Sequence, residues 1–316
     1  MSKPITHRKP SRTAARSATV ANGSLNVLQT VSARWMAGAV ATVLLAATLC
    51  VWGALCLTFW QGSWQLLYHP AAAITSTPAN VGLAFDSVDF AATESGQPQL
   101  HGWWVPSASS GSRFTAIYLH GADGNIGGTV EALVPLHAAG VNILDFDYRG
   151  YGMSQFIHPS EESWREDAES AFGYLRDTRH ILAGALILTG RGLGANLALE
   201  MAVAHPEIAG VVLDNPLDRP TDAIFNDSRA RLVPAHALVR DQWESDQPAT
   251  SLRIPSLWFY RMPPKSKPRP INTEAYDKVT ARKMRVWLDN SPEAETNSGF
   301  ALSRWLDDLP QNGRYR

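Results

Sequence analysis

The chain has 316 residues, of which 45% are hydrophobic and 18% charged, and its formal net charge is −1. This composition suits one medium-sized globular domain or two small ones, and it excludes collagen-like, coiled-coil and wholly disordered chains. A net charge near zero lacks the basic footprint typical of nucleic-acid-binding proteins, so we expect no nucleic-acid partner.

The average charge conceals an uneven distribution along the chain. The first 34 residues contain no acidic residue and six basic ones, which are Lys3, Arg8, Lys9, Arg12, Arg16 and Arg34. No further charged residue appears before Asp86, and the other 22 of the 28 basic residues stand against 29 acidic ones, so the remainder carries −7. The basic tail, residues 1–34, lacks hydrophobic periodicity, and we expect it to be disordered.

An uncharged stretch follows the tail and is predicted to be a transmembrane anchor over residues 35–60. Its apolar core of 24 residues, Met36 to Phe59, spans roughly 36 Å as a helix, which exceeds a hydrocarbon layer of about 30 Å. Trp35 lies at one end and Trp60 and Trp64 lie at the other, where interfacial aromatic residues are expected. A cleaved signal peptide is the alternative, but its apolar core has only about 7 to 15 residues. We therefore expect a single-pass signal anchor.

The basic residues also predict the orientation of this anchor. Because six positive charges precede the apolar stretch and none follows closely, the N-terminus is expected in the cytoplasm and residues 61–316 outside it. In a Gram-negative bacterium the domain would face the periplasm from the inner membrane. The membrane is thus the first expected partner.

Both cysteines, Cys50 and Cys56, lie inside the predicted anchor. The rest of the chain therefore has no disulfide framework, no Cys-ligated zinc site and no cysteine nucleophile. No group of His and carboxylate residues has the spacing of metal ligands, so we expect neither a metal nor a cofactor.

From residue 85 to the end, short apolar runs alternate with helical patterns, which predicts an α/β domain at 85–316 after a lead-in at 61–84. An initial hairpin precedes strands that alternate with helices, which indicates a mostly parallel sheet with flanking helices. The eight predicted strands cover residues 85–90, 100–105, 115–119, 141–147, 185–189, 210–213, 256–260 and 285–288. The predicted helices cover residues 129–139, 163–178, 193–204, 273–281 and 300–309.

Three glycine-containing segments follow predicted strands and are more specific than this pattern. Residues 118–125 follow the third strand, residues 147–152 follow the fourth, and Gly190-Arg191-Gly192-Leu193-Gly194 joins the fifth strand to a helix. An α/β-hydrolase fold places its oxyanion loop and its nucleophile elbow at these strand ends. In this order the segments predict an eight-stranded α/β-hydrolase fold preceded by one transmembrane helix.

The chain resembles membrane-anchored α/β-hydrolase-domain proteins, a serine hydrolase-like family with an N-terminal helix and a Leu-Leu-Tyr-His-Pro-like lead-in. Here the lead-in is Leu66-Leu67-Tyr68-His69-Pro70, and the likeness continues through Leu100-His101-Gly102-Trp103-Trp104 to about Asn215. It covers the C-terminal third only in the order of strands and helices. The resemblance implies hydrolysis of an ester, thioester or amide by a Ser, Asp and His triad.

This sequence lacks the residues of such a triad at the matching positions. Gly192 takes the place of the serine in the elbow, and a hydrogen atom cannot attack an acyl carbon. The acid usually follows the seventh strand, but the segment from Arg261 to Arg269 has no carboxylate. The base usually follows the eighth strand, but the last histidine of the chain is His236. The triad is therefore degenerate.

The features that remain at this position favour ligand binding. The backbone N–H groups of Ala122 and Leu193 are expected to form an oxyanion hole at the positive end of a helix. The other residues expected in this relic pocket are His120, Gly121, Asp123, Gly190, Arg191 and Gly194. With the four positive charges between residues 261 and 269, the pocket is expected to bind an anion such as a carboxylate or phosphate. The alternative is that Arg191 points away and the basic loop is a solvated rim.

Three polar residues near these loops have simpler interpretations. We expect His120 to pack within its own loop, and Asp145 and Asp147 to brace loops rather than to act in catalysis.

Two main functions stay open. The first is a catalytically inactive, membrane-tethered homologue that binds a small anionic or acyl ligand or a protein partner. The second is an active hydrolase with a displaced apparatus, in which Ser228, His236 or Asp241 of the polar segment 218–251 acts near the pocket mouth. The spacing of these three residues forms no recognisable triad, so the first hypothesis is preferred. A purely structural role is the third possibility.

Overall fold

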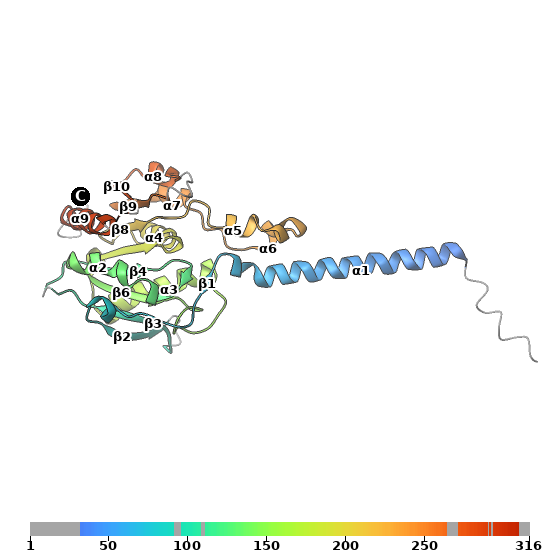
Figure 1. Cartoon of the computed structure of the whole chain (residues 1–316), viewed down its shortest axis with the longest axis horizontal. Helices are drawn as coiled ribbons and strands as arrows, with labels where there is room; N and C mark the ends of the chain where they lie inside the picture. The colour runs from blue at the N-terminus through green and yellow to red at the C-terminus, as the bar shows by residue number, and fades with distance from the viewer. Residues whose placement is uncertain are drawn as a thin grey trace, which may run out of the picture. The chain divides into compact units, whose positions relative to one another are not determined.

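The structure is a computed structural model of the chain, and Figure 1 shows its helices and strands. The residues that it describes are 32–91, 96–108, 111–263, 271–289, 291 and 293–309. The chain divides into two compact units, Met1–Leu55 and Cys56–Arg316. Residues 1–31 of the predicted disordered tail lie outside the described residues, so that prediction stays open.

One long helix, α1 (Ala33–Gly62), contains the predicted anchor. It continues into the 3-10 helix η2 (Ser63–Leu66), and among the described residues this is the one stretch long and apolar enough to cross a membrane. The helix extends beyond both ends of the predicted anchor because it contains no proline that would break it. Cys50 and Cys56 are free thiols within it.

An eight-stranded sheet forms the centre of the second unit, with the strand order β10-β9-β8-β7-β4-β6-β3-β2. Only the pairs β2–β3 and β3–β6 are antiparallel. The strands are β2 (Asp86–Ala91), β3 (Pro98–Val105), β4 (Thr115–Leu119), β6 (Asn142–Asp147), β7 (Leu186–Arg191), β8 (Gly210–Asp214), β9 (Ser256–Arg261) and β10 (Lys283–Leu288). The prediction of an eight-stranded, mostly parallel sheet that begins with a hairpin is confirmed.

Helices cover both faces of this sheet (Figure 1). The longer ones are α2 (Val130–Ala138), α3 (Glu161–Gly173), α4 (Leu193–Ala204) and α9 (Glu293–Asp307). Helix α2 packs against α9, and α3 packs against α4. Val212 and Leu213 are successive residues of β8 whose side chains point to opposite faces, and both are buried. The core therefore has two layers, one on each side of the sheet.

Helices α3 and α9 differ most from their predicted ranges. Helix α3 begins two residues early because Ser160 caps it, and the Ser160 hydroxyl accepts a hydrogen bond from the N–H of Ser163 at 3.1 Å. The α-helix ends at Gly173 and continues as a π-helical turn, η5 (Tyr174–Thr178). Helix α9 begins at Glu293, seven residues before the predicted start.

The polar segment 218–251, here called the cap segment, consists of short helical pieces. These are α5 (Asp222–Phe225), η7 (Ser228–Leu232), α6 (Ala235–Leu238) and α7 (Asp246–Ser251). Asn196 of α4 holds the residue before the segment and a residue before α7, because its side-chain N–H groups donate to the Leu217 carbonyl and the Ser245 hydroxyl, each at 2.6 Å. The cap segment is thus anchored to the helix that begins at the elbow.

The lead-in forms structure that the sequence did not predict. A two-residue strand, β1 (His69–Pro70), pairs in parallel with β5 (Asp123–Gly124), which lies in the loop after β4. The remaining short elements are η3 (Pro78–Val81), η4 (Ile126–Gly128), η6 (Ala183–Ala185) and α8 (Glu274–Lys278). The β1–β5 pair joins the lead-in to the predicted oxyanion loop.

Candidate functional site

The loop after β4 and the turn after β7 meet at the carboxyl ends of these two neighbouring strands. A Cβ atom on Gly194 would lie 2.1 Å from the Leu119 carbonyl oxygen, and one on Gly190 would lie 2.2 Å from the Gly194 carbonyl oxygen. A Cβ atom on Gly121 would approach the Arg191 carbonyl oxygen to 3.3 Å. Backbone packs directly on backbone here, so Gly190 and Gly194 have no room for a side chain.

Gly192 stands at the tip of this turn and differs from its neighbours. Its φ and ψ angles are 58° and −124°, and it immediately precedes α4. No heavy atom lies within 4 Å of the place where its Cβ would be, and its N–H donates to the Asp214 carbonyl at 2.9 Å. This is the sharp strand-to-helix turn of an elbow, and its tip faces open space. A side chain would have room there, but none is present.

Ala122 and Leu193, the predicted oxyanion-hole residues, lie on the two segments that meet. Leu193 is the first residue of α4, so its N–H has no acceptor within the helix. The Ala122 carbonyl accepts hydrogen bonds from the His69 N–H at 2.8 Å and the Tyr151 hydroxyl at 2.9 Å. These two bonds fix the loop that carries the Ala122 N–H.

The position expected for the catalytic acid holds a cation. Arg261 ends β9, and its guanidinium forms a bidentate pair with Asp214, with Nε–Oδ1 and Nη2–Oδ2 distances of 2.9 Å each. Arg191 Nε lies 3.7 Å from the same carboxylate. Two arginines therefore share one carboxylate beside the elbow, which leaves a net positive charge. The rest of the predicted basic loop, residues 264–270, lies outside the described residues.

No histidine follows β10, where the base is expected. The described residues after Leu288 begin with Asp289, whose Oδ1 accepts from the N–H of Ser291 at 3.1 Å. His236 is the last histidine of the sequence and stacks on Phe225 in the cap segment, with ring centroids 4.1 Å apart. Among the described residues, no histidine lies after β10 to act as the base.

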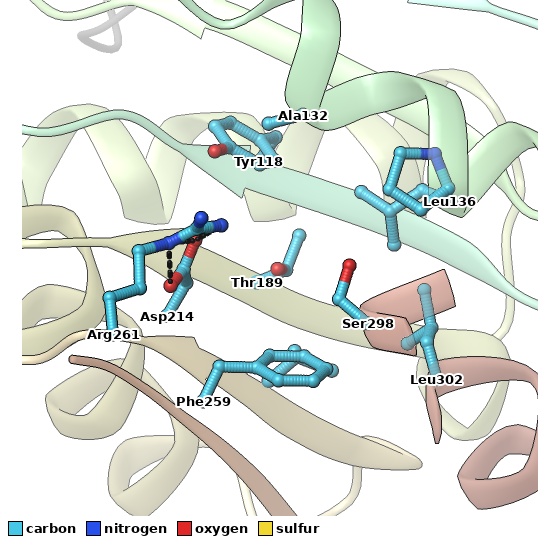
Figure 2. A pocket seen from close by; sticks show the side chains of 11 residues that line it. Tyr118, Ala132, Leu136, Thr189, Asp214, Phe259, Arg261, Ser298 and Leu302 are labelled. Atoms are coloured by element: carbon cyan, nitrogen blue, oxygen red, sulfur yellow. Dashed lines mark hydrogen bonds and ion pairs between the residues drawn. The ribbon is translucent and has the colours of Figure 1, made fainter. Parts of the chain in front are cut away.

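A cavity of about 50 Å³ lies between the sheet and helices α2 and α9, next to the arginine–aspartate pair. Figure 2 shows Tyr118 and Thr189, which are paired across β4 and β7, on one side and the Asp214–Arg261 pair beside them. Burial raises the pKa of Tyr118 above its ordinary value, so its hydroxyl stays protonated and can donate. The apolar wall consists of Ala132, Pro135, Leu136, Val212, Phe259 and Leu302. Ser298 of α9 completes the polar lining.

None of the predicted relic-pocket residues lines this cavity. Asp214 nevertheless contacts both the elbow and a residue of the cavity lining. Its side chain accepts hydrogen bonds from Arg261, and its backbone carbonyl accepts one from the N–H of Gly192. This cavity was not predicted from the sequence, because its walls consist of typical core residues. The sequence offered only two hydroxyl residues, Tyr118 and Thr189, each near the end of a predicted strand, and their pairing across β4 and β7 became visible only in the fold.

Comparison with known proteins places these observations in a family. The family model of the serine aminopeptidases S33 matches residues 112–260. An uncharacterized protein of Mycobacterium tuberculosis is 30% identical over 202 residues, which cover 64% of this chain and 70% of the relative. The chain belongs to the α/β-hydrolase family.

Other α/β hydrolases and relatives resemble the chain over a similar extent. YfhR of Salmonella typhi is 27% identical over 260 residues, covering 77% of this chain and 85% of its own. The esterase Pf2001 of Pyrococcus furiosus superposes with a TM-score of 0.58 at 19% identity, over 76% of this chain and 98% of the esterase. An α/β hydrolase of Vibrio vulnificus superposes with a TM-score of 0.54 at 19% identity, over 73% of this chain and 82% of the hydrolase. These two structures share the α/β-hydrolase fold with this chain.

His120 of this α/β-hydrolase domain is buried in an aromatic cluster. Its ring centroid lies 4.5 Å from that of Tyr148, 5.1 Å from that of Tyr151 and 6.0 Å from that of Trp164. Burial lowers the pKa of His120 to about 4, and Nδ1 lies 2.8 Å from the Gly121 carbonyl oxygen. The neutral ring thus contacts its own loop at Gly121, as predicted, but it packs on aromatic residues of two other segments, which was not predicted.

Asp145 and Asp147 are buried and brace the loops that follow the strands. Asp147 Oδ1 accepts a hydrogen bond from the N–H of Ile126 at 2.9 Å, and the Thr129 hydroxyl donates to Asp145. Burial raises the pKa of Asp147 to about 6 and that of Asp145 well above its ordinary value. Both contacts agree with the predicted structural role.

One histidine–carboxylate pair at the loop after β4 was not predicted from the sequence. His69 Nδ1 lies 2.8 Å from Asp123 Oδ1, because β1 pairs with β5 and brings the two residues into register. A carboxylate on Nδ1 leaves Nε2 as the free nitrogen of the ring, and both side chains are exposed to solvent. Asp123, expected in the relic pocket, thus lies within the predicted oxyanion loop and has a histidine as its partner.

The three residues considered for a displaced catalytic apparatus, Ser228, His236 and Asp241, have different contact partners. Asp241 accepts a hydrogen bond from the Tyr68 hydroxyl at 2.5 Å, whereas His236 stacks on Phe225. Ser228 begins η7. Within the described part of the chain, no group of three or more His, Cys, Asp or Glu residues could hold a metal ion.

Proposed function

We propose that this protein is a membrane-tethered, catalytically inactive α/β-hydrolase homologue that binds a small carboxylate at the vacated catalytic site. One observation carries the proposal: Gly192 holds the conformation of a nucleophile elbow, faces open space and has no side chain. The adjacent acid position supports it, because Arg261 occupies that place and is paired with Asp214.

The charge and shape of the site favour a carboxylate. Arg191, Arg261 and Asp214 together leave one positive charge beside the elbow, and Arg191 is about half exposed. The N–H of Leu193 at the start of the 12-residue helix α4 adds a favourable field for an anion. The adjoining cavity has an apolar wall and a Tyr118 hydroxyl that can donate. A short acyl chain would pack against this apolar wall while its carboxylate group faces Arg191 and Arg261.

Calorimetric titration of the full chain in nanodiscs tests this binding. Acetate, butyrate, hexanoate and inorganic phosphate are the probes, and we expect saturable binding of at least one carboxylate. Arg191→Ala should weaken it by about ten-fold, the loss typical of a hydrogen bond to a charged group. Arg253→Ala is the matched control, because Arg253 contacts only backbone carbonyls of its own segment in the described structure. No binding, or equal binding by both variants, would contradict the proposal.

Catalytic inactivity has its own test. A fluorophosphonate probe should not label any serine of the chain, and short acyl esters should not be hydrolysed, because no described side chain provides the nucleophile at Gly192. Stoichiometric labelling of a serine would overturn this part of the proposal.

The pair His69–Asp123 favours a second candidate function, an active hydrolase with a displaced base. In that case His69 would take a proton from water while the N–H groups of Ala122 and Leu193 hold the substrate oxygen. Ester hydrolysis that is lost in His69→Ala and reduced in Asp123→Asn would select this candidate. Unchanged background hydrolysis in both variants would select the inactive homologue.

The tether and its orientation are part of the same proposal. The apolar stretch Ala33–Leu66 and the basic tail that precedes it support a cytoplasmic N-terminus and an extracytoplasmic domain. Alkaline phosphatase fused after the last residue should be active in a bacterial host, and green fluorescent protein at the same place should stay dark. The reverse result would reverse the orientation.

A further inference from the structure

A second cavity lies where the chain leaves α1, away from the elbow. Its volume is about 120 Å³, and its lining comes from the end of α1, η2, the start of α3 and the cap segment. The lining residues are Trp60, Ser63, Trp64, Pro159, Ser160, Ile224, Leu238, Val239, Arg240 and Asp241. It shares no residue with the cavity beside Arg261.

The surroundings of this cavity are aromatic and apolar, although they are open to solvent. The Trp60 side chain is 48% exposed, and Trp64 stacks on His158 with ring centroids 4.8 Å apart. Phe156 lies edge-on to His158 at 6.1 Å and is 78% exposed. Met153, three residues before Phe156, is also exposed. Several large apolar side chains exposed at and near one cavity favour a contact surface over an ordinary solvated face.

Two polar groups in the lining are suited to the phosphate and ester groups of a lipid. Arg240 is exposed at the cavity and supplies a positive charge. The indole Nε1 of Trp64 is buried and has no hydrogen-bond acceptor among the described residues. A buried donor without an acceptor costs about 1 to 3 kcal/mol, so an acceptor brought by a ligand would be favoured.

The opposite side of the cavity is held in place by hydrogen bonds. Asp241 accepts from the Tyr68 hydroxyl at 2.5 Å and from the N–H of Glu161 at 3.2 Å, so both of its carboxylate oxygens have donors. Trp243 Nε1 donates to the same tyrosine hydroxyl at 2.9 Å. These contacts position the cap segment against the lead-in and fix the shape of the cavity.

We propose that this cavity binds a phospholipid of the membrane in which α1 is anchored. The inference rests on the proposed tether: if α1 spans the bilayer, Trp60 and Trp64 lie at the level of the lipid headgroups, where tryptophan is enriched. Covalent continuity then holds the cavity beside the leaflet. The lipid phosphate contacts Arg240, an ester oxygen accepts from Trp64, and the first carbons of an acyl chain lie against Ile224 and Leu238.

Photocrosslinking tests this assignment on the full chain. The protein is placed in phosphatidylcholine nanodiscs that contain a small fraction of phosphatidylcholine with a photoactivatable acyl chain, and adducts are mapped by mass spectrometry. Adducts are expected on α1 and on the cap peptide that contains Leu238 and Val239. Arg240→Ala should lower the cap adduct by about ten-fold, the loss expected for one hydrogen bond to a charged group.

Two further variants separate a lipid site from an effect on folding. Arg231→Ala is the control, because Arg231 is an exposed arginine of the same segment that does not line the cavity. Val239→Phe fills the cavity and should also remove the cap adduct, while its unfolding midpoint in urea stays near that of the wild type. Adducts on α1 in every variant serve as the internal standard.

The outcomes distinguish this inference from the proposed tether. Adducts on α1 without any on the cap peptide, or equal cap adducts in Arg240→Ala and Arg231→Ala, would overturn the lipid site and leave the tether intact. Extraction of the protein from native membranes by alkaline carbonate would instead overturn the tether, and the lipid site with it.

Discussion

The ends of β4 and β7 and the ends of β8 and β9 lie along one edge of the same sheet, but different interactions shape them. At β4 and β7, backbone packs on backbone, and Gly190 and Gly194 leave no space for a Cβ atom. At β8 and β9, the side chains of Asp214 and Arg261 pair with each other. The first arrangement supports the fold whether or not the site is catalytic. The second consists of side chains that can change without rebuilding the turn.

This difference explains how an elbow can persist without a nucleophile. The turn is specified by the close packing of its flanking glycines, whereas the residue at its tip faces open space. Glycine at the tip also avoids the strain of about 1 to 3 kcal/mol that a side chain meets in such a conformation. A glycine at the tip is therefore compatible with the fold, and it can make the domain more stable than a serine would.

The largest expected effect comes from a methyl group at a flanking glycine. Gly194→Ala places a Cβ atom 2.1 Å from the Leu119 carbonyl oxygen, so backbone must move. We expect the free energy of unfolding to fall by about 3 kcal/mol or more. Urea unfolding of the full chain in detergent, followed by tryptophan fluorescence, measures the change.

Gly192→Ala is the matched control for this comparison. Its Cβ atom meets no neighbour within 4 Å, so only backbone strain remains and we expect a loss of about 1 kcal/mol. Equal losses in the two variants would show that close packing at Gly194 does not specify the turn.

The free energy of unfolding, measured as a function of pH, tests the buried carboxylate of Asp147 at the end of β6. Burial raises the pKa of Asp147 to about 6 from 3.8, so the folded protein keeps a proton that the unfolded chain has released. This contribution is fully present below about pH 4 and is lost as the pH rises through 6. Between pH 3 and 7 the free energy of unfolding should fall by about 3 kcal/mol more in the wild type than in Asp147→Asn. Parallel profiles would contradict the assignment.

The sequence predicted the framework of this domain well because the framework depends on local patterns. Residues 186–189 form a mostly apolar run, Gly190-Arg191-Gly192 follows it, and the helix Leu193–Ala204 comes next; all three features are visible in the sequence. The position of Gly192 at the elbow follows from the same pattern.

The side-chain partners at the site could not be predicted in this way. Arg261 and Asp214 are 47 residues apart and meet only because β8 and β9 are adjacent in the sheet. His69 and Asp123 meet through a two-residue strand, which is too short to show any periodicity. The pairing depends on tertiary register, and a single sequence does not reveal that register.

A smaller effect is expected at the side-chain pair. Asp214→Ala leaves Arg261 without its bidentate partner in a partly buried position, so we expect a loss of about 2 kcal/mol in the free energy of unfolding. Asp177→Ala is the control, because Asp177 pairs with Arg176 on the surface and should have no measurable effect. The same urea titration measures both. Similar losses would mean that the pair beside the elbow contributes no more than a surface ion pair.

Restoring the nucleophile alone is expected to have no effect on ester turnover, which makes it the smallest effect of all. Gly192→Ser has room for its side chain and recreates the sequence pattern of a serine elbow, but the chain has no histidine after His236 to accept the serine proton. Members of a triad act as a unit, so one restored residue should give no ester turnover above the wild type and no fluorophosphonate labelling. Hydrolysis of p-nitrophenyl acetate by the full chain in nanodiscs measures the first, and in-gel fluorescence measures the second. Turnover that appears in Gly192→Ser and disappears in the double variant with His69→Ala would instead show that the His69–Asp123 pair can serve as the missing base.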